Sequence, residues 1–258
     1  MRFKKRLLTV FCLLMALGLA ACASTGEIAM KKERAQAAQE LGEAYMRQEA
    51  YTKALREFLK AEKIYAKDAY LQNDLGLAYM AKNRHDKAIE HFKYALELDS
   101  EFSPARNNLG AAYMENEEWD KAIETFKAVK DDLLYATPHY PLANLGFIYY
   151  HQGDYRKALS YYKEALILMP DFPRALHGRG RVYLKQGRYD KALIALEKAA
   201  RKASNNPRIL MDLGTAYRHV HEYNKAYKTF KKAASLAAEG SQLEEEAERQ
   251  AEAVWRFH

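Results

Sequence analysis

Cysteine is nearly absent from this chain of 258 residues, which has only Cys12 and Cys22. Both lie near the amino terminus, so the body of the chain has no disulfide framework and no cysteine-based metal site. No two of the eight histidines are four residues apart around a glutamate, and there is no Gly-x-Ser-x-Gly motif or phosphate-binding glycine loop. We therefore expect no catalytic site, no metal and no cofactor.

A strong charge of one sign is also missing. The formal net charge is +7, from 41 basic and 34 acidic residues, and four of the basic residues lie within residues 2–6. Without those four the balance is 37 minus 34, or +3. A balance this small does not favour nucleic acid as a partner.

The amino terminus has the features of a targeting segment. A basic stretch over residues 1–6 precedes an apolar run over residues 7–17, which predicts a signal peptide over residues 1–21. The sequence Leu-Ala-Ala-Cys that ends at Cys22 resembles a bacterial lipobox, and this resemblance implies that Cys22 carries acyl chains. Ala23 rather than aspartate follows, which by the same resemblance favours the outer membrane, facing the periplasm. The alternative is an ordinary secretory signal with an incidental cysteine.

A glycine recurs along the chain every 34 residues, with one interval of 36. A tyrosine follows each glycine by three residues and an alanine follows it by twelve. If the glycine is position 8 of each copy, positions 4, 7, 8 and 11 share one stripe of a first helix, and positions 20, 24 and 27 share one stripe of a second. Small residues at positions 8 and 20 are expected to let the two helix axes approach closely. The glycines are Gly42, Gly76, Gly110, Gly146, Gly180 and Gly214.

This repeated pattern resembles the tetratricopeptide repeat (TPR) family. The first copy has Leu41, Gly42, Tyr45, Ala54, Phe58 and Ala61 at the matching positions. The resemblance implies an all-α, right-handed superhelix (α-solenoid) of six helix-turn-helix repeats over residues 35–240, an architecture that binds proteins and is not an enzyme. Arg179, which replaces a leucine at position 7, is one of few departures.

Shorter segments flank the repeats. Residues 22–34 are mostly small and polar, and we expect a lipidated tether that becomes helical before the first repeat. After Gly240, the sequence from Ser241 to Glu244 has a capping-box pattern, which predicts a helix within residues 241–258. This helix is expected to cover the end of the stack, and a partner-binding role is the alternative.

Positions 2, 5, 9, 12 and 13 of the first helices are not needed for packing, so we expect them to line a concave groove for a partner protein. Asparagine amides suit the backbone of an extended peptide, and arginines toward the carboxyl end suit an acidic partner. Glu40, Glu43 and Asp74 are expected to make the amino end acidic. The alternative is an ordinary solvated helix face. The predicted groove residues are Asn73, Leu77, Met80, Asn107, Asn108, Met114, Asn144, Phe147, Tyr150, Arg174, His177, Arg181 and Arg208.

The connection between the third and fourth copies is irregular. Residues 130–141 contain two extra residues together with Pro138 and Pro141, which discourage helix continuation. The segment is either a tolerated loop insertion or a kink that alters the superhelix or presents Tyr135 and His139 to a partner. With the lipobox and six repeats, this lengthened junction resembles the PilF/PilW type IV pilus biogenesis lipoproteins.

That narrower resemblance implies a pilotin, a lipid-anchored scaffold that helps a pore-forming secretin to assemble in the outer membrane. Three alternatives remain at this point: a periplasmic adaptor for cell-wall synthesis or hydrolysis enzymes, a regulatory subunit of an enzyme complex, and a periplasmic holdase. The expected partners are a protein, which this resemblance implies is the secretin, and the membrane through the lipid anchor.

Overall fold

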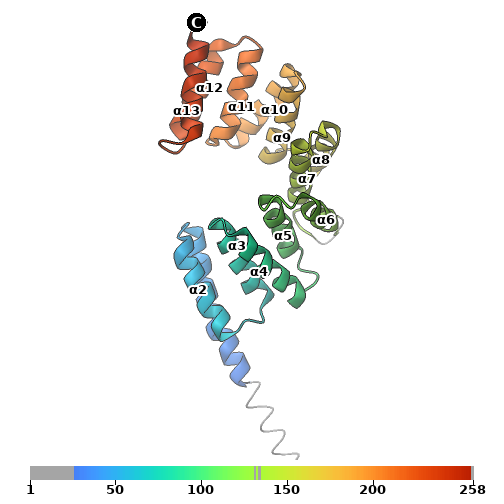
Figure 1. Ribbon diagram of the computed structural model, residues 1–258, viewed down its shortest axis with the longest axis vertical. Coiled ribbons are helices and arrows are strands. Elements are labelled where there is room, and N and C mark those ends of the chain that lie inside the picture. The colour runs from blue at the N-terminus through green and yellow to red at the C-terminus, as the bar shows by residue number, and fades with distance from the viewer. Residues whose placement is uncertain (1–25, 131, 133–134, 257–258) are drawn as a thin grey trace, which may run out of the picture. The chain divides into compact units, whose positions relative to one another are not determined.

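The computed structural model describes residues 26–130, 132 and 135–256, and within them it contains α-helices and no strand. The predicted all-α fold of helix-turn-helix repeats is confirmed (Figure 1). The predicted signal peptide and Cys22 lie outside the described residues. Within the described part, none of the helices combines the length and the apolar composition that a membrane span requires.

The helices alternate as first and second members of hairpins. A helix over residues 26–47 is the first member of the first hairpin, so residues 26–34 of the predicted tether are already helical. The remaining helices are α2 (Tyr51–Ile64), α3 (Ala69–Ala81), α4 (His85–Leu98), α5 (Ser103–Glu115), α6 (Trp119–Lys130), α7 (His139–His151), α8 (Tyr155–Leu168), α9 (Pro173–Lys185), α10 (Tyr189–Lys202), α11 (Pro207–His219), α12 (Tyr223–Leu236) and α13 (Gln242–Trp255).

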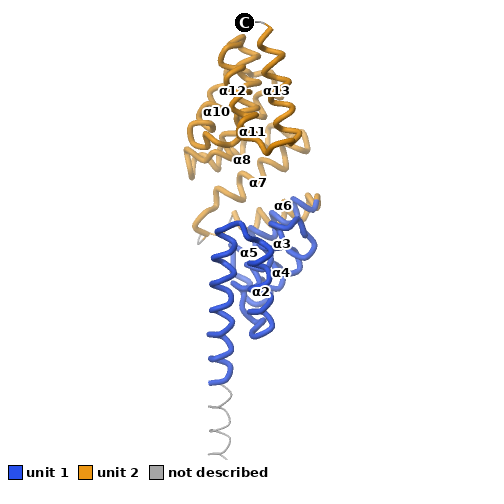
Figure 2. The backbone as a smooth tube through the Cα atoms, turned by 90° about the vertical axis from the view of Figure 1, so that its left-hand side faces the viewer, with its two compact units in different colours: residues 1–116 blue, residues 117–258 orange. Residues whose placement is uncertain are grey.

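The chain divides into two compact units, which Figure 2 shows in different colours. Unit 1 comprises residues 1–116 and unit 2 comprises residues 117–258. The division falls between α5 and α6, which are the two helices of the third predicted repeat. It does not fall at the lengthened connection over residues 130–141.

Glycine at position 8 accommodates the ring at position 24 of the same hairpin. A Cβ added to Gly76 would lie 2.4 Å from Cε1 of Phe92, and one added to Gly42 would lie 2.4 Å from Cε1 of Phe58. The glycine therefore makes room for the ring at position 24 itself, whereas the sequence predicted that ring beside a close contact of two helix axes. Phe58 and Phe92 are fully buried, and burial of a phenylalanine contributes about 1.5–3 kcal/mol.

Each hairpin turn has one residue in the left-handed region, always at position 15. Four of these residues carry a Cβ, namely Glu49, Asn83, Glu117 and His221, with φ between 55° and 63°. In the first hairpin the Ala50 N–H donates to Tyr45 O and the Glu49 N–H donates to Met46 O. These two bonds form the Schellman pattern, which closes the end of a helix by satisfying its last carbonyls.

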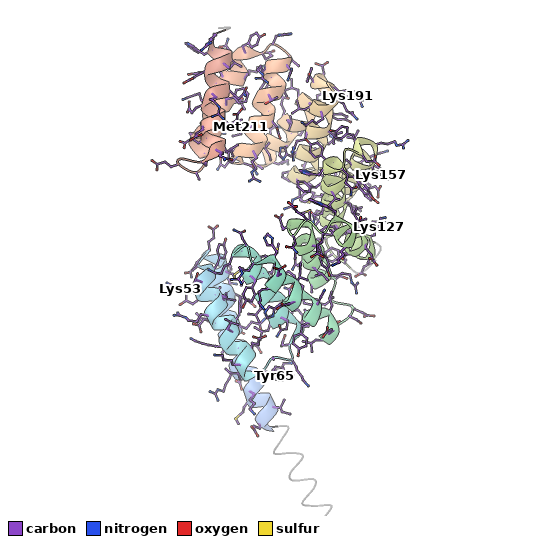
Figure 3. The ribbon with its side chains drawn as sticks, in the orientation of Figure 1. Lys53, Tyr65, Lys127, Lys157, Lys191 and Met211 are labelled. Carbon is purple, nitrogen blue, oxygen red and sulfur yellow. The ribbon has the colours of Figure 1, made fainter. Side chains whose placement is uncertain are left out.

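Lysine at position 19 lies over the tyrosine at position 11 of the same hairpin. Nζ of Lys157 is 4.9 Å from the centre of the Tyr149 ring, and Nζ of Lys53 is 5.6 Å from that of Tyr45. Lys53 and Lys157 are labelled in Figure 3. A cation–π contact at an exposed site contributes about 0.5–1 kcal/mol, so these repeated residues stabilise the hairpins that contain them.

Within each unit the stack curves toward its first helices. In unit 1, α3 contacts α5, and in unit 2, α7 contacts α9 and α9 contacts α11. Among the described helices of each single unit, no second helix contacts the second helix of the next hairpin: α2 and α4 do not, and neither do α6 and α8, α8 and α10, or α10 and α12. The first helices are thus closer together, which places them on the inner side of the curvature.

The carboxyl-terminal helix begins as predicted. Oγ of Ser241 accepts a hydrogen bond from the Glu244 N–H at 3.2 Å, which confirms Ser241 as the N-cap. The Glu244 carboxylate accepts from the Gly240 N–H at 2.6 Å, one residue before the position that a capping box uses. α13 packs on α11 and α12 with Ala247 and Val254 buried, so it covers the end of unit 2.

Candidate protein-binding face

The candidate site is the first-helix face, defined as positions 2, 5, 6, 9 and 12 of the first helices. All predicted groove residues lie on these helices and form two sets, one in each unit. Unit 1 contains Asn73, Leu77 and Met80 on α3 and Asn107, Asn108 and Met114 on α5; unit 2 contains Asn144, Phe147 and Tyr150 on α7, Arg174, His177 and Arg181 on α9, and Arg208 on α11.

Neighbouring first helices are connected by a side-chain hydrogen bond from position 5 of one repeat to position 6 of the next. Gln39 Nε2 donates to Asp74 Oδ2 at 2.7 Å. Asn108 Nδ2 donates to Asn73 Oδ1 at 2.8 Å. Positions 5 and 6 of adjacent repeats face each other, so we call this recurring set of bonds the polar ladder.

The polar ladder continues in unit 2 with different chemistry. Nε2 of His177 lies 2.6 Å from Oδ2 of Asp212, again from position 5 to position 6 of the next repeat. Arg181 also faces Asp212, with Nε 3.8 Å from the same oxygen. Asp212 therefore offsets part of the positive charge that the sequence predicts for this end of the chain.

Asn73 and Asn144 differ from the open amides that the sequence suggests. Asn73 is 8% exposed and Asn144 is 3% exposed. The Asn73 carbonyl accepts from Asn108, and Asn144 Oδ1 accepts from Nη1 of Arg174 at 2.9 Å. Both asparagines connect neighbouring first helices, because helix packing covers positions that a helical wheel places at the edge of the groove.

The ladder has no side-chain bond between the fourth and fifth repeats, where Ala143 and Gly178 occupy the two positions. A Cβ added to Gly178 would lie 2.2 Å from Cζ of Tyr162, and one added to Gly146 would lie 2.6 Å from Cε1 of the same ring. The Tyr162 ring of α8 is thus enclosed by two glycines of successive first helices. Burial raises the pKa of its hydroxyl, which stays protonated at neutral pH.

Arg181 is held on the first-helix face with its hydrogen-bond donors unused. Its guanidinium lies 4.4 Å from the centre of the Tyr150 ring. Among the described residues none of its N–H groups makes a hydrogen bond, and Arg174, two helical turns earlier on α9, uses one. A guanidinium fixed by an aromatic ring retains donors for a carboxylate, which it binds in bidentate geometry.

Aromatic side chains extend this surface toward the carboxyl end of α7. The His151 ring is 4.3 Å from that of Phe147 and 6.3 Å from that of Trp119, and the second pair is stacked. Burial and the nearby charge of Arg181 lower the pKa of His151. The imidazole is therefore neutral at pH 7. The three rings form an uncharged aromatic surface beside the arginines.

The first-helix face of unit 1 is acidic at its amino end. Asp74 is half-buried, and mainly this burial raises the pKa of its carboxyl to about 6; the charges of Glu43 and Asp68 act in the same direction. The hydrogen bond from Gln39 acts in the opposite direction. The two units therefore present first-helix faces of opposite charge, acidic in unit 1 and arginine-rich in unit 2.

The sequence matches the tetratricopeptide repeat family over residues 79–133 and 149–211. The matched residues form the helical hairpins described above. The chain contains tetratricopeptide repeats. No protein with a curated description matches the sequence.

Solved structures with a similar fold include other tetratricopeptide repeat proteins. Pseudomonas aeruginosa PilF is 20% identical with a TM-score of 0.70, over 85% of this chain and 99% of the PilF chain. PilW, a type IV pilus biogenesis factor, is 21% identical with a TM-score of 0.71, over 82% and 97% of the two chains. A chain of the APC/C hetero-tetramer Cut9–Hcn1 is 16% identical with a TM-score of 0.75, over 89% of this chain and 46% of that one. The TM-scores show a shared fold, and at these low identities the similarity shows no more than the fold.

The sequence did not predict two residues that contribute to the first-helix face. Asp212 is at position 6 of its repeat, as Asp74 is. A comparison of position 5 with position 6 of the next repeat would have predicted the hydrogen bond between Asp212 and His177. Tyr162 belongs to a second helix. The only sequence signal that its buried ring packs under the first-helix face is Gly178, a glycine at position 6, where the ring leaves no room for a Cβ. Within the part of the chain that the structure describes, no group of three or more His, Cys, Asp or Glu side chains is placed to hold a metal ion.

Proposed function

We propose that this chain is a scaffold whose first-helix faces hold segments of partner proteins. The observation that carries the proposal is Arg181, which is fixed between Tyr150 and Asp212 while its donors remain unused. Arg174 and the exposed Arg208 add positive charge to the same unit. The chemistry favours an acidic partner segment on unit 2, with apolar side chains placed against Phe147.

The favoured task is pilotin-like support of a type IV pilus secretin in the outer membrane. Similarity to PilF and PilW supports this assignment, since it covers 85% and 82% of this chain and 99% and 97% of theirs. The predicted lipidation of Cys22 and the lengthened segment over residues 130–141 support it further. In this proposal the chain is attached to the outer membrane by its acyl group and faces the periplasm.

An arginine substitution pair tests the binding face. Arg174→Glu with Arg181→Glu is expected to weaken binding of the partner segment about tenfold or more, because each charge-assisted hydrogen bond contributes about 1.5–3 kcal/mol. Arg156→Glu is the matched control, since Arg156 is exposed on the second helix α8. Affinity is measured with purified partner, and circular dichroism checks that the variants fold. Equal affinities for all three proteins would reject the unit 2 face.

The pilus assignment has a separate test in cells. A deletion strain is expected to lose secretin multimers from its outer membrane, and the wild-type chain or Arg156→Glu should restore them. The double arginine variant should not. Unchanged secretin multimers in the deletion strain would reject this task, and altered cell-wall cross-linking in their place would favour the adaptor alternative.

A further inference from the structure

The carboxyl end of α8 and the residue that follows it expose three consecutive apolar residues, which we call the apolar tip. Ile167, Leu168 and Met169 are 68%, 54% and 41% exposed. The residues that match Ile167 at position 29 of other repeats are polar or charged: Lys63, Glu97, Arg201 and Ser235. An apolar residue at position 29 is thus a property of the fourth repeat, whereas Leu168 at position 30 matches Ile64, Leu98 and Leu236 of other repeats. Ile167 extends this recurring apolar position into a larger exposed surface.

A cluster of rings supports the apolar tip. The Phe172 N–H donates to Met169 O at 3.1 Å and closes the turn. The rings of His139 and Tyr140 lie 4.8 Å and 5.0 Å from the buried ring of Phe172. Tyr140 itself is exposed and extends the apolar surface. The tip is therefore presented by a packed base.

Three cations at the end of α10 lie beside the turn that follows the apolar tip. Leu166, just before it, packs in a cluster with Ala199 of α10, which brings the end of α10 beside the turn. Nζ of Lys202 lies 2.7 Å from Oδ2 of Asp171, the acidic residue of the turn. Lys198 and Arg201 also act on Asp171, and with Lys202 they lower the pKa of its carboxyl. All three cations are exposed, so the local charge is positive.

These features fit a lipid surface better than a protein pocket. Three consecutive apolar side chains are exposed at the end of one helix, and a helix end by itself offers no hollow for the side chains of a partner. A bilayer accepts such a protrusion, because apolar side chains enter the boundary of the acyl chains while lysine and arginine bind the phosphates. Tyrosine suits the same boundary, since its ring is apolar and its hydroxyl is polar.

We propose that the apolar tip inserts into the surface of an anionic lipid bilayer, with Lys198, Arg201 and Lys202 on the headgroups. This contact is separate from the predicted lipid anchor at Cys22. It also does not depend on which protein the first-helix faces hold. It would fix the side of unit 2 that faces the membrane.

A fluorescent label at the tip tests the proposal in the full chain. Cys12→Ser and Cys22→Ser remove the natural thiols, and Leu168→Cys then carries an environment-sensitive label. Ile194→Cys is the matched control, since Ile194 is 58% exposed on α10 and lies outside the tip. Vesicles of phosphatidylcholine are compared with vesicles of phosphatidylcholine and phosphatidylglycerol, each with and without a nitroxide-labelled lipid as quencher.

The label at residue 168 is expected to shift to shorter wavelength and lose most of its emission to the quencher, on the anionic vesicles alone. The label at residue 194 should not change. Lys198→Gln with Arg201→Gln, or high salt, should reverse the shift, because salt screens exposed charges. Attachment of another part of the chain to vesicles does not produce this pattern, because the readout is local.

Three results would overturn the proposal: no change at residue 168, an equal change at residue 194, or an equal response to phosphatidylcholine alone. If the emission of the label at residue 168 does not change with vesicles but shifts on addition of a purified partner protein, the tip belongs to a protein interface.

Discussion

The side-chain amide of Asn108 donates to Oδ1 of Asn73, whereas the buried Oδ1 of Asn107 has no hydrogen-bond partner among the described residues. Asn73 and Asn107 occupy the same position of consecutive repeats. Asn73→Ala is expected to lower the free energy of unfolding by about 1–3 kcal/mol, because Asn108 loses its partner. Asn107→Ala should change it by less than about 0.5 kcal/mol. Urea unfolding measures both, and equal losses would contradict this assignment.

Asp74 is expected to make stability fall as pH rises. Burial raises the pKa of its folded-state carboxyl to about 6 from 3.8, so the folded chain holds this proton more tightly than the unfolded chain does. The stabilisation is complete below about pH 4 and is lost as pH rises through 6. Asp74→Asn should therefore stabilise the chain at pH 7.5, by at most about 3 kcal/mol, and not at pH 4. Unfolding midpoints at the two pH values measure this. A benefit of equal size at both would disprove the role of the charge.

Gly178→Ala is expected to cost about 1–3 kcal/mol, because its Cβ would overlap the ring of Tyr162. Tyr162→Leu removes the overlapping atoms, and Leu196 shows that a repeat accepts leucine at this position. In the Tyr162→Leu background the same Gly178→Ala change should cost less, since alanine also favours the helix by about 1 kcal/mol over glycine. Denaturant unfolding of the four proteins gives the coupling free energy. A coupling of zero would show that the ring moves aside freely.

Glu49→Gly is expected to raise the thermal unfolding temperature. Glu49 has φ of 57°, and a left-handed conformation costs a residue with a Cβ about 1–2 kcal/mol. Glycine adopts it freely but loses more entropy on folding, so the net gain is about 1 kcal/mol or less. Glu49→Ala is the control and should give no gain, because it keeps the Cβ. A stabilisation by alanine equal to that by glycine would mean that the glutamate charge is responsible.

The repeat period predicts the hairpins because it records packing that recurs in every copy. The tyrosine at position 11, the glycine at position 8 and the large side chain at position 24 all lie inside one hairpin, so one sequence repeats the same packing in every copy, with a ring at position 24 in five copies and Leu196 in the fifth repeat. The division between α5 and α6 leaves no such signal. Glu117 lies at the division, but it has the same left-handed conformation as position 15 of every other hairpin, so nothing in the sequence distinguishes this turn.

The site was harder to predict because its side chains pair between hairpins. A helical wheel correctly places Asn144 and Arg174 on first helices, but it does not show that they bond to each other. The partial neutralisation of Arg181 by Asp212 likewise depends on contacts between repeats. Sequence spacing gives the face of each helix, and only the packed structure gives the hydrogen-bonding state of each group on it.

The polar ladder has a consequence for assembly of the stack. Hairpins with the same residues at the signature positions share those apolar contacts, so the contacts alone do not distinguish the correct neighbour from another copy. The rungs differ, with amide on carboxylate at Gln39, amide on amide at Asn73 and imidazole on carboxylate at His177. A misordered stack that faced Asp74 with Ala143 in place of Gln39 would leave the carboxylate without its partner, at about 1–3 kcal/mol. Such mismatches disfavour shuffled hairpins.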